Sequence, residues 1–188
     1  MDEEVFGMRI SKKEIKDRQV VTGLLLQCPV GRLGTVGKDG YPMVKPLNFV
    51  YHEEKIYFHS AKEGEKIEDI TRDSRVCFEI DLPVTFVRSA GVPCKADYLY
   101  RSVIIKGRAC IVTERFERLS ALEWLMKKYQ PEGGYGAIPE DKLQLTAVVR
   151  IEIEEMVGKE DLGKDTEREA VLNLMKNAAL QPADLERK

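Results

Sequence analysis

Residues 55–66, KIYFHSAKEGEK, pass from a strand pattern into the start of a helix. The segment 56–59 carries the aromatic and branched side chains typical of strands. The charged residues that follow lead into Ile67 and Ile70 of a helix expected to end by Ser74. A helix N-terminus offers unpaired N–H groups and a partial positive charge. An anion would therefore be favoured at this junction.

The junction holds further groups suited to an anion. Lys62 and Lys66 add two cations about one helical turn apart, and Ser60 adds a hydroxyl donor. Gly64 lets the backbone approach a ligand closely because it has no side chain. These residue types predict a phosphate site. A solvated, charged helix start with a serine cap accounts for them equally well, so both interpretations stay open at this point.

The sequence on both sides of this junction is dominated by strand patterns. Runs of branched and apolar residues predict strands at residues 30–36, 42–51, 76–80, 98–112 and 145–153. Asp39 and Gly40 have the chemistry of a tight turn between the first two strands. Segment 83–97 contains two prolines and a glycine, and we expect it to be a partly irregular loop. Short links between strands indicate antiparallel pairing.

Three amphipathic helices are predicted at residues 11–27, 114–129 and 165–180. The first is expected to begin at Ser11, because Ser11 and Glu14 have the spacing of a capping box. The fold class that follows is mainly β: an antiparallel barrel with peripheral helices. We expect residues 1–160 to form the barrel domain with its N-terminal helix. Residues 161–188 are expected to add an amphipathic helix that packs on the barrel or on a dimer partner.

Composition excludes several classes of function. The chain has 188 residues and a net charge of -2, which gives no electrostatic footprint for nucleic acid. No apolar run is long enough to span a membrane, and residues 1–11 lack the pattern of a signal peptide, so we expect a cytoplasmic protein without a membrane partner. Four cysteines without a C-x-x-C pair and two histidines do not predict a metal site. Mostly buried, reduced thiols are expected, with a reactive Cys94 as the alternative.

Common catalytic motifs are missing from the sequence. There is no phosphate-loop, nucleophile-elbow or zinc-protease motif, and the glycines of segment 31–34 begin a strand rather than a helix, unlike a dinucleotide-binding loop. His59 is either a residue that hydrogen-bonds to backbone at the strand end or a cofactor contact. Arg101, flanked by two hydroxyl residues, is either a surface charge or a ligand for an anion.

Four short runs together resemble the pyridoxamine 5'-phosphate oxidase-like superfamily, and more narrowly its nitroimidazole-resistance branch of flavin-binding proteins. They are VGRLGTV at 30–36, DGYP at 39–42, PLNFVY at 46–51 and the 55–66 stretch quoted above. Cys94 and the run YRSVI at 100–104 also fit this branch. The resemblance covers about residues 8–155. Each run is short, and it is their combination that is specific.

This resemblance implies an antiparallel split β-barrel, a homodimer, and FMN at the dimer interface, with FAD as the alternative cofactor. Residues matching the 59–66 segment hold the flavin phosphate in such proteins, with Lys66 at the usual basic position and Lys45 near it. Positions matching 32–35 and 46–49 line the ring and the ribityl chain. The predicted cofactor-binding residues are Arg32, Leu33, Gly34, Thr35, Lys45, Pro46, Leu47, Asn48, Phe49, His59, Ser60, Ala61, Lys62, Gly64, Lys66 and Arg101.

The activity implied by the resemblance is that of a flavin-dependent oxidoreductase, nitroreductase-like in character. Neither the small-molecule substrate nor the electron donor follows from the sequence, and no catalytic side chain is assigned. A flavin-binding or storage module without its own substrate is one alternative. A haem-handling split barrel with His59 as an axial ligand is another. The C-terminal residues lack the basic and aromatic set of true pyridoxamine phosphate oxidases, so that reaction is not implied.

Overall fold

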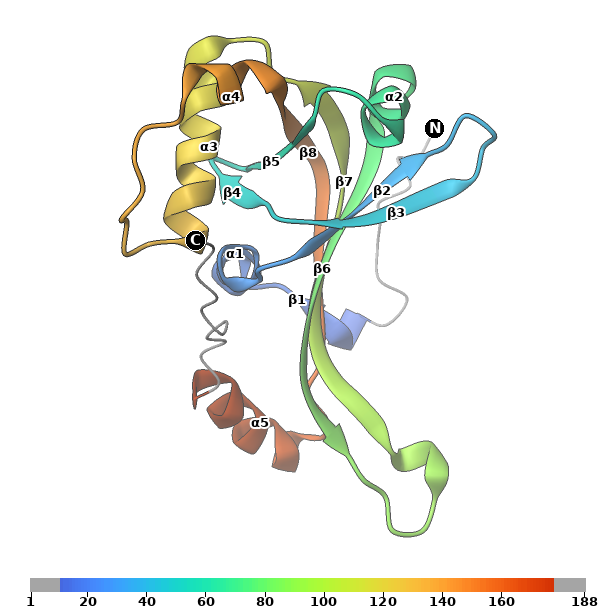
Figure 1. Ribbon diagram of the computed structural model, residues 1–188. Helices are drawn as coiled ribbons and strands as arrows, with labels where there is room; N and C mark the ends of the chain where they lie inside the picture. Colours follow the sequence, from blue (N-terminus) through green and yellow to red (C-terminus); the bar gives the residue numbers. More distant parts are fainter. Residues whose placement is uncertain (1–10, 178–188) are drawn as a thin grey trace.

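The computed structural model describes residues 11–177, and its centre is one antiparallel sheet (Figure 1). The sheet has eight strands in the order β3-β2-β6-β7-β8-β5-β4, and β1 pairs separately with β8. The strands are β1 (Glu14–Ile15), β2 (Gly31–Val36), β3 (Pro42–Leu47), β4 (Val50–His52), β5 (Lys55–Ala61), β6 (Arg75–Val87), β7 (Asp97–Ile111) and β8 (Thr146–Asp161). The helices are α1 (Arg18–Gln27), α2 (Glu65–Arg72), α3 (Arg115–Tyr129), α4 (Glu140–Leu145) and α5 (Asp165–Asn177). The predicted mainly β, antiparallel fold with peripheral helices is confirmed.

The two ends of the sheet meet without a ladder of hydrogen bonds between them. β3 and β4 are its outermost strands, yet only Asn48 and Phe49 separate them in the chain. Tyr129, at the end of α3, stabilises the chain at this break. Its hydroxyl accepts a hydrogen bond from the Phe49 N–H at 2.9 Å and lies 2.7 Å from the Pro29 carbonyl oxygen. The sequence predicted one strand over 42–51, and the break at Asn48 corrects that prediction.

The main hydrophobic core fills the inside of this sheet. Leu33, Phe49, Phe58 and Phe78 are fully buried there, and Phe49 meets Phe78 edge to face with ring centroids 4.9 Å apart. Apolar side chains of α1 and α2 complete the same core. A second cluster joins α3 to the opposite side of β4, β5 and β8. The helices therefore close the ends and flanks of the barrel.

The first helix begins at Arg18, so its predicted start at Ser11 is wrong. Residues 14–15 form β1 instead, with Ile15 opposite Gly158 of β8 and buried in the main core. Asp17 caps α1 by accepting a hydrogen bond from the Gln19 N–H at 2.8 Å. Pairing with a distant strand and burial of Ile15 outweigh the local capping pattern that Ser11 and Glu14 offered.

β6 and β7 form a long hairpin that extends beyond the barrel in Figure 1. The predicted loop over 83–97 is therefore wrong for its first residues, since β6 continues to Val87. Pro83 is accommodated at a register shift, after which Phe86 faces Tyr98. β8 likewise runs past its predicted end to Asp161, and the short helix α4 was not predicted.

α5 lies against this hairpin, where Val171 joins Leu99 and Leu162 in a third cluster. The predicted helix 165–180 is observed as far as Asn177, and residues 178–180 lie outside the described part of the chain. The expectation of mostly buried thiols is wrong: Cys28 is buried, whereas Cys77 and Cys94 are exposed. None of the helices within residues 11–177 is long and apolar enough to cross a membrane.

The buried position of Lys128 of α3 predicts that the stability of the fold depends on pH. Its ammonium lies 3.6 Å from the Phe49 ring centroid and donates to the Leu25 carbonyl at 3.2 Å, and burial lowers the pKa of Lys128 to about 8. An exposed lysine has a pKa of about 10.4, so unfolding takes up a proton between these values and stability should rise with pH across that window. Below pH 8 the cost of burying the charge is fully present.

We expect the unfolding free energy of the wild type to gain about 1–2 kcal/mol relative to Lys128→Met between pH 7.5 and 10, after allowance for solvent screening. Denaturant unfolding of both proteins at each pH measures this, and the difference cancels other titrating groups. Parallel stability curves for the two proteins would show that Lys128 is not the group responsible.

Candidate functional site

The junction between β5 and α2 is where the sequence predicted an anion site. Gly64 precedes the first residue of α2 with φ of 114°, a region that favours glycine, and a Cβ there would meet open space. Gly64 has no side chain to accept hydrogen bonds from the first-turn N–H groups of α2. The Ile67 N–H bonds to the Gly64 carbonyl oxygen at 2.9 Å, so the N–H groups of Glu65 and Lys66 are the first-turn donors that remain for water or for an anion.

Two lysines from different elements meet beside this helix start. Lys45 of β3 and Lys66 of α2 are 21 residues apart in the chain, and the predicted phosphate-binding set included both. The pKa of Lys66 lies below its usual value, first because its ammonium is partly buried and then because the Lys45 charge is close. The Lys66 ammonium also lies 5.4 Å from the Phe58 ring centroid. Two cations that repel each other favour an anion between them.

His59 belongs to the same neighbourhood. Its position at the end of β5 is exposed, yet surrounding atoms partly desolvate the imidazole, and the charge of Lys66 acts on it as well. Both effects lower the pKa of His59, so the ring is neutral at pH 7 and offers one donor and one acceptor. Ser60 is half-buried beside it, whereas Ala61 and Lys62 are exposed.

Asp69 ties α2 to the barrel beneath these lysines. The carboxylate is 2% exposed, accepts a hydrogen bond from the Thr35 hydroxyl at 2.9 Å, and accepts another from Arg72 at 2.7 Å. Burial alone would raise its pKa, but the hydrogen bonds from Arg72 and Thr35 lower it. The side chain of Thr35, predicted to line a cofactor, therefore anchors α2. Asp69 was missed in the sequence, where the only signal was an acid next to Ile70 on the apolar face of the helix.

The other predicted lining residues divide between the two faces of β2 and β3. Leu33, Leu47 and Phe49 point into the core and can meet a ligand only through their backbone. Arg32, Pro46 and Asn48 are exposed, and Gly34 is half-buried on the outer face. The Arg32 guanidinium lies 3.2 Å from the Glu79 carboxylate and also pairs with Asp81. Among these residues, those on the outer face are the ones whose side chains a ligand can reach.

Arg101 lies on β7, opposite Leu82 of β6 and Glu160 of β8. Its Nε donates to Glu160 at 2.9 Å, and Glu160 is 9% exposed and also accepts from Arg168. Within one chain, Arg101 is therefore committed to a carboxylate. Its contact with a flavin in a partner subunit stays a prediction.

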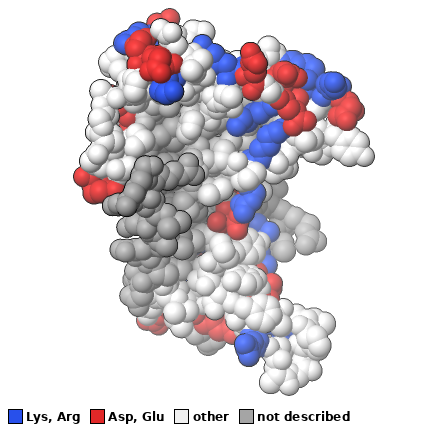
Figure 2. All heavy atoms as spheres, in the orientation of Figure 1, with Lys and Arg blue, Asp and Glu red and all other residues white. Residues whose placement is uncertain are grey.

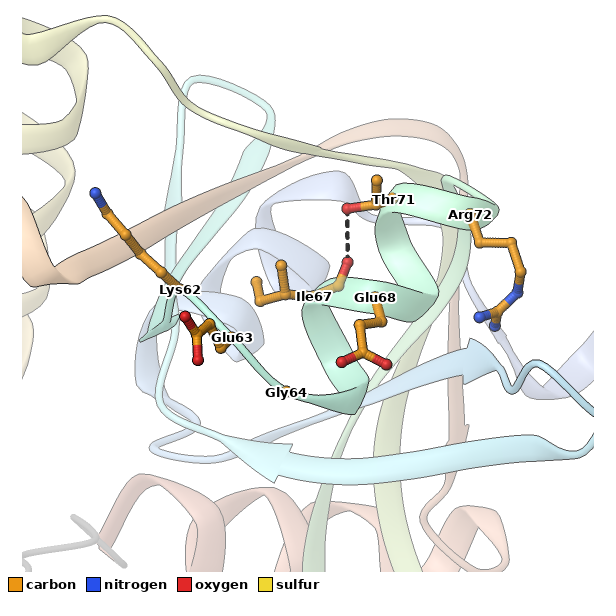
Figure 3. A pocket seen from close by; sticks show the side chains of 7 residues that line it. All are labelled: Lys62, Glu63, Gly64, Ile67, Glu68, Thr71 and Arg72. Atoms are coloured by element: carbon orange, nitrogen blue, oxygen red, sulfur yellow. Dashed lines mark hydrogen bonds between the residues drawn. The ribbon is translucent and has the colours of Figure 1, made fainter.

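A shallow groove of about 430 Å³ runs along α2 from this junction (Figure 3). It is lined by Lys62, Glu63, Gly64, Ile67, Glu68, Thr71 and Arg72. Figure 3 shows the Lys62 side chain extending away from the helix, while Glu68 projects from its first turn. Figure 2 shows that charges of both signs gather over this upper part of the molecule, whereas the lower hairpin carries few on the same face.

A scan against protein families matches residues 17–160 to the pyridoxamine 5'-phosphate oxidase family. The matched range includes strands β2 to β8, apart from the last residue of β8. It also contains Lys45 and Lys66. The chain belongs to the pyridoxamine 5'-phosphate oxidase family. Its fold is accordingly a split β-barrel, as the resemblance implied, and the antiparallel sheet broken between β3 and β4 is the form that this fold takes here.

Solved structures extend the comparison of this family member. A proposed 5-nitroimidazole antibiotic resistance protein from Bacteroides thetaiotaomicron is 25% identical, with a TM-score of 0.70 over 78% of this chain and 85% of that one. An FAD-binding protein from Mesorhizobium loti is 26% identical, with a TM-score of 0.55 over 77% and 95%. A flavocytochrome from Azotobacter vinelandii, 21% identical with a TM-score of 0.71 over 87% and 78%, shares the fold. No curated protein matches the chain.

Proposed function

We propose that this split-barrel protein binds FMN, with its phosphate at the start of α2, and acts as a flavin-dependent, nitroreductase-like oxidoreductase. The observation that carries the proposal is the position of Lys45 at the start of α2, 2.9 Å from Glu65, where its charge acts on Lys66 and where the helix lacks a side-chain cap. Family membership and the two relatives described above support the coarser part of this proposal: the FAD-binding protein supports a flavin, and the nitroimidazole-resistance protein supports the nitroreductase-like activity.

The residues present fit a phosphate ester. A phosphate dianion would relieve the repulsion between Lys45 and Lys66, and it would accept hydrogen bonds from the first two N–H groups of α2, those of Glu65 and Lys66. The Ser60 hydroxyl and the neutral His59 ring are further donors at the same junction. Arg32, Gly34, Pro46 and Asn48 would then border the flavin ring and ribityl chain from the outer face of β2 and β3.

Bound FMN would supply the electron-transfer chemistry, and the protein would bind it, orient it and exclude water. Lys66 and Lys45 hold the phosphate end in this proposal. The Asp69–Thr35 hydrogen bond keeps α2, and with it both the helix start and Lys66, at a constant position against β2. No side chain is assigned as a general acid or base.

We further propose a homodimer with the flavin at its interface. The outer sheet face and the hairpin expose large apolar side chains, including Val44 at 63%, and Phe86 and Tyr98 at 51% each. Such a surface favours a second copy of the chain, related by two-fold symmetry. Sedimentation equilibrium at micromolar concentration is expected to give twice the chain mass. A monomer that still binds FMN would contradict the shared site.

The visible spectrum of the purified protein tests the cofactor, and the activity test follows on the same sample. We expect the two absorption bands of oxidised flavin, release of FMN rather than FAD on denaturation, bleaching by NADH or NADPH, and reoxidation by a nitroimidazole. A Soret band would instead indicate the haem alternative. Bound flavin that neither donor bleaches would indicate a binding or storage module.

A further inference from the structure

The Glu65 carboxylate lies at the same place where the proposed function puts a phosphate. Its Oε2 is 2.9 Å from the Lys45 ammonium, and Asp69 is the next acid at 3.8 Å. The Lys45 nitrogen is buried, yet neither carboxylate meets it with hydrogen-bond geometry. The two carboxylates therefore balance the positive charge of Lys45, while the N–H groups of its ammonium make no hydrogen bond.

We propose that Glu65 competes with the phosphate for Lys45 and thereby sets how tightly this site holds a phosphate ester. The proposal rests on the proposed function, because it concerns the same anion site. Glu65 is the first residue of α2, where the helix dipole already favours a negative side chain. The Glu65 carboxylate at that position has the same sign of charge as a phosphate, and it would use the same hydrogen-bond donors.

The two acids beside Lys45 differ in how freely they can leave. Asp69 is 2% exposed and already accepts hydrogen bonds from Thr35 and Arg72, so it stays in place as part of the scaffold. The Glu65 side chain is 56% exposed and can turn toward water at little cost. An incoming phosphate would displace Glu65 from Lys45, and it would still be repelled by that carboxylate nearby.

Removing this competitor should strengthen phosphate binding. We expect Glu65→Gln to lower the dissociation constant for FMN by about three- to tenfold at low salt, with a smaller gain at high salt. Riboflavin, which lacks the phosphate, should bind both proteins equally. The matched control is Glu68→Gln, which removes the same charge from the same helical turn, where Glu68 lines the groove instead of pairing with Lys45. It should change FMN affinity by less than about twofold.

A double-mutant cycle separates the Lys45 contact from a general charge effect. In a Lys45→Met background, the gain from Glu65→Gln should fall below about twofold. An equal gain in that background, an equal gain from Glu68→Gln, or unchanged affinity in Glu65→Gln would overturn the proposal while leaving FMN binding by the wild type intact. Failure of both the wild type and Glu65→Gln to bind FMN would overturn the proposed function as well.

Discussion

Replacing Lys66 with alanine is expected to weaken FMN binding by about one to two orders of magnitude, because one charge-assisted contact to a phosphate contributes roughly 1.5–3 kcal/mol. Lys66 stands at the helix start, and the nearby Lys45 charge already lowers its pKa. A bound dianion would stabilise the charged form of both lysines. Quenching of flavin fluorescence measures the dissociation constant, at one fixed salt concentration because phosphate contacts weaken as salt rises.

Two controls accompany this experiment. Lys142→Ala removes an exposed lysine of α4 and should leave FMN affinity unchanged. Riboflavin should bind the wild type and Lys66→Ala with equal affinity, since it has no phosphate. A folded Lys66→Ala protein with wild-type affinity for FMN would remove Lys66 from the phosphate site.

Gly31→Ala is expected to destabilise the fold by about 3 kcal/mol, near the upper end of what overpacking a core costs. A Cβ at Gly31 would lie 2.1 Å from the Phe78 ring carbon Cζ, much closer than any real contact. Phe78 is fully buried against Phe49, so its ring cannot move aside without disturbing the main core. Urea denaturation followed by circular dichroism measures the loss.

Gly34→Ala is the matched control, three residues along the same strand. A Cβ there would approach the Cys77 carbonyl oxygen to 3.3 Å, which a small shift relieves, so we expect a loss of less than about 1 kcal/mol. Gly31→Ala combined with Phe78→Leu should be less destabilised than the sum of the two single changes, because the smaller side chain makes room. Equal losses for Gly31→Ala and Gly34→Ala would show that the Phe78 contact is not the cause.

The strand-to-helix junction at 55–66 was predictable because every signal in it is local. Branched and aromatic residues, then Gly64, then charged residues with Ile67 and Ile70 at helical spacing describe β5 and α2 with small errors at their ends. The antiparallel fold class followed for the same reason. The start of α1 could not be predicted in this way, because β1 exists only through its pairing with β8, more than 140 residues away in the chain.

The sequence by itself determined the family, the mainly β fold and the residue types of the proposed phosphate site at the start of α2. Only the tertiary structure decided that Lys45 stands beside Lys66 and Glu65, that Thr35 is bound to Asp69, and that Arg101 is paired with Glu160. The physical reason is that local patterns report the periodicity of one element at a time. Which side chains meet across elements depends on strand register, and a slip of one residue would move Lys45 or Thr35 to the opposite face of the sheet.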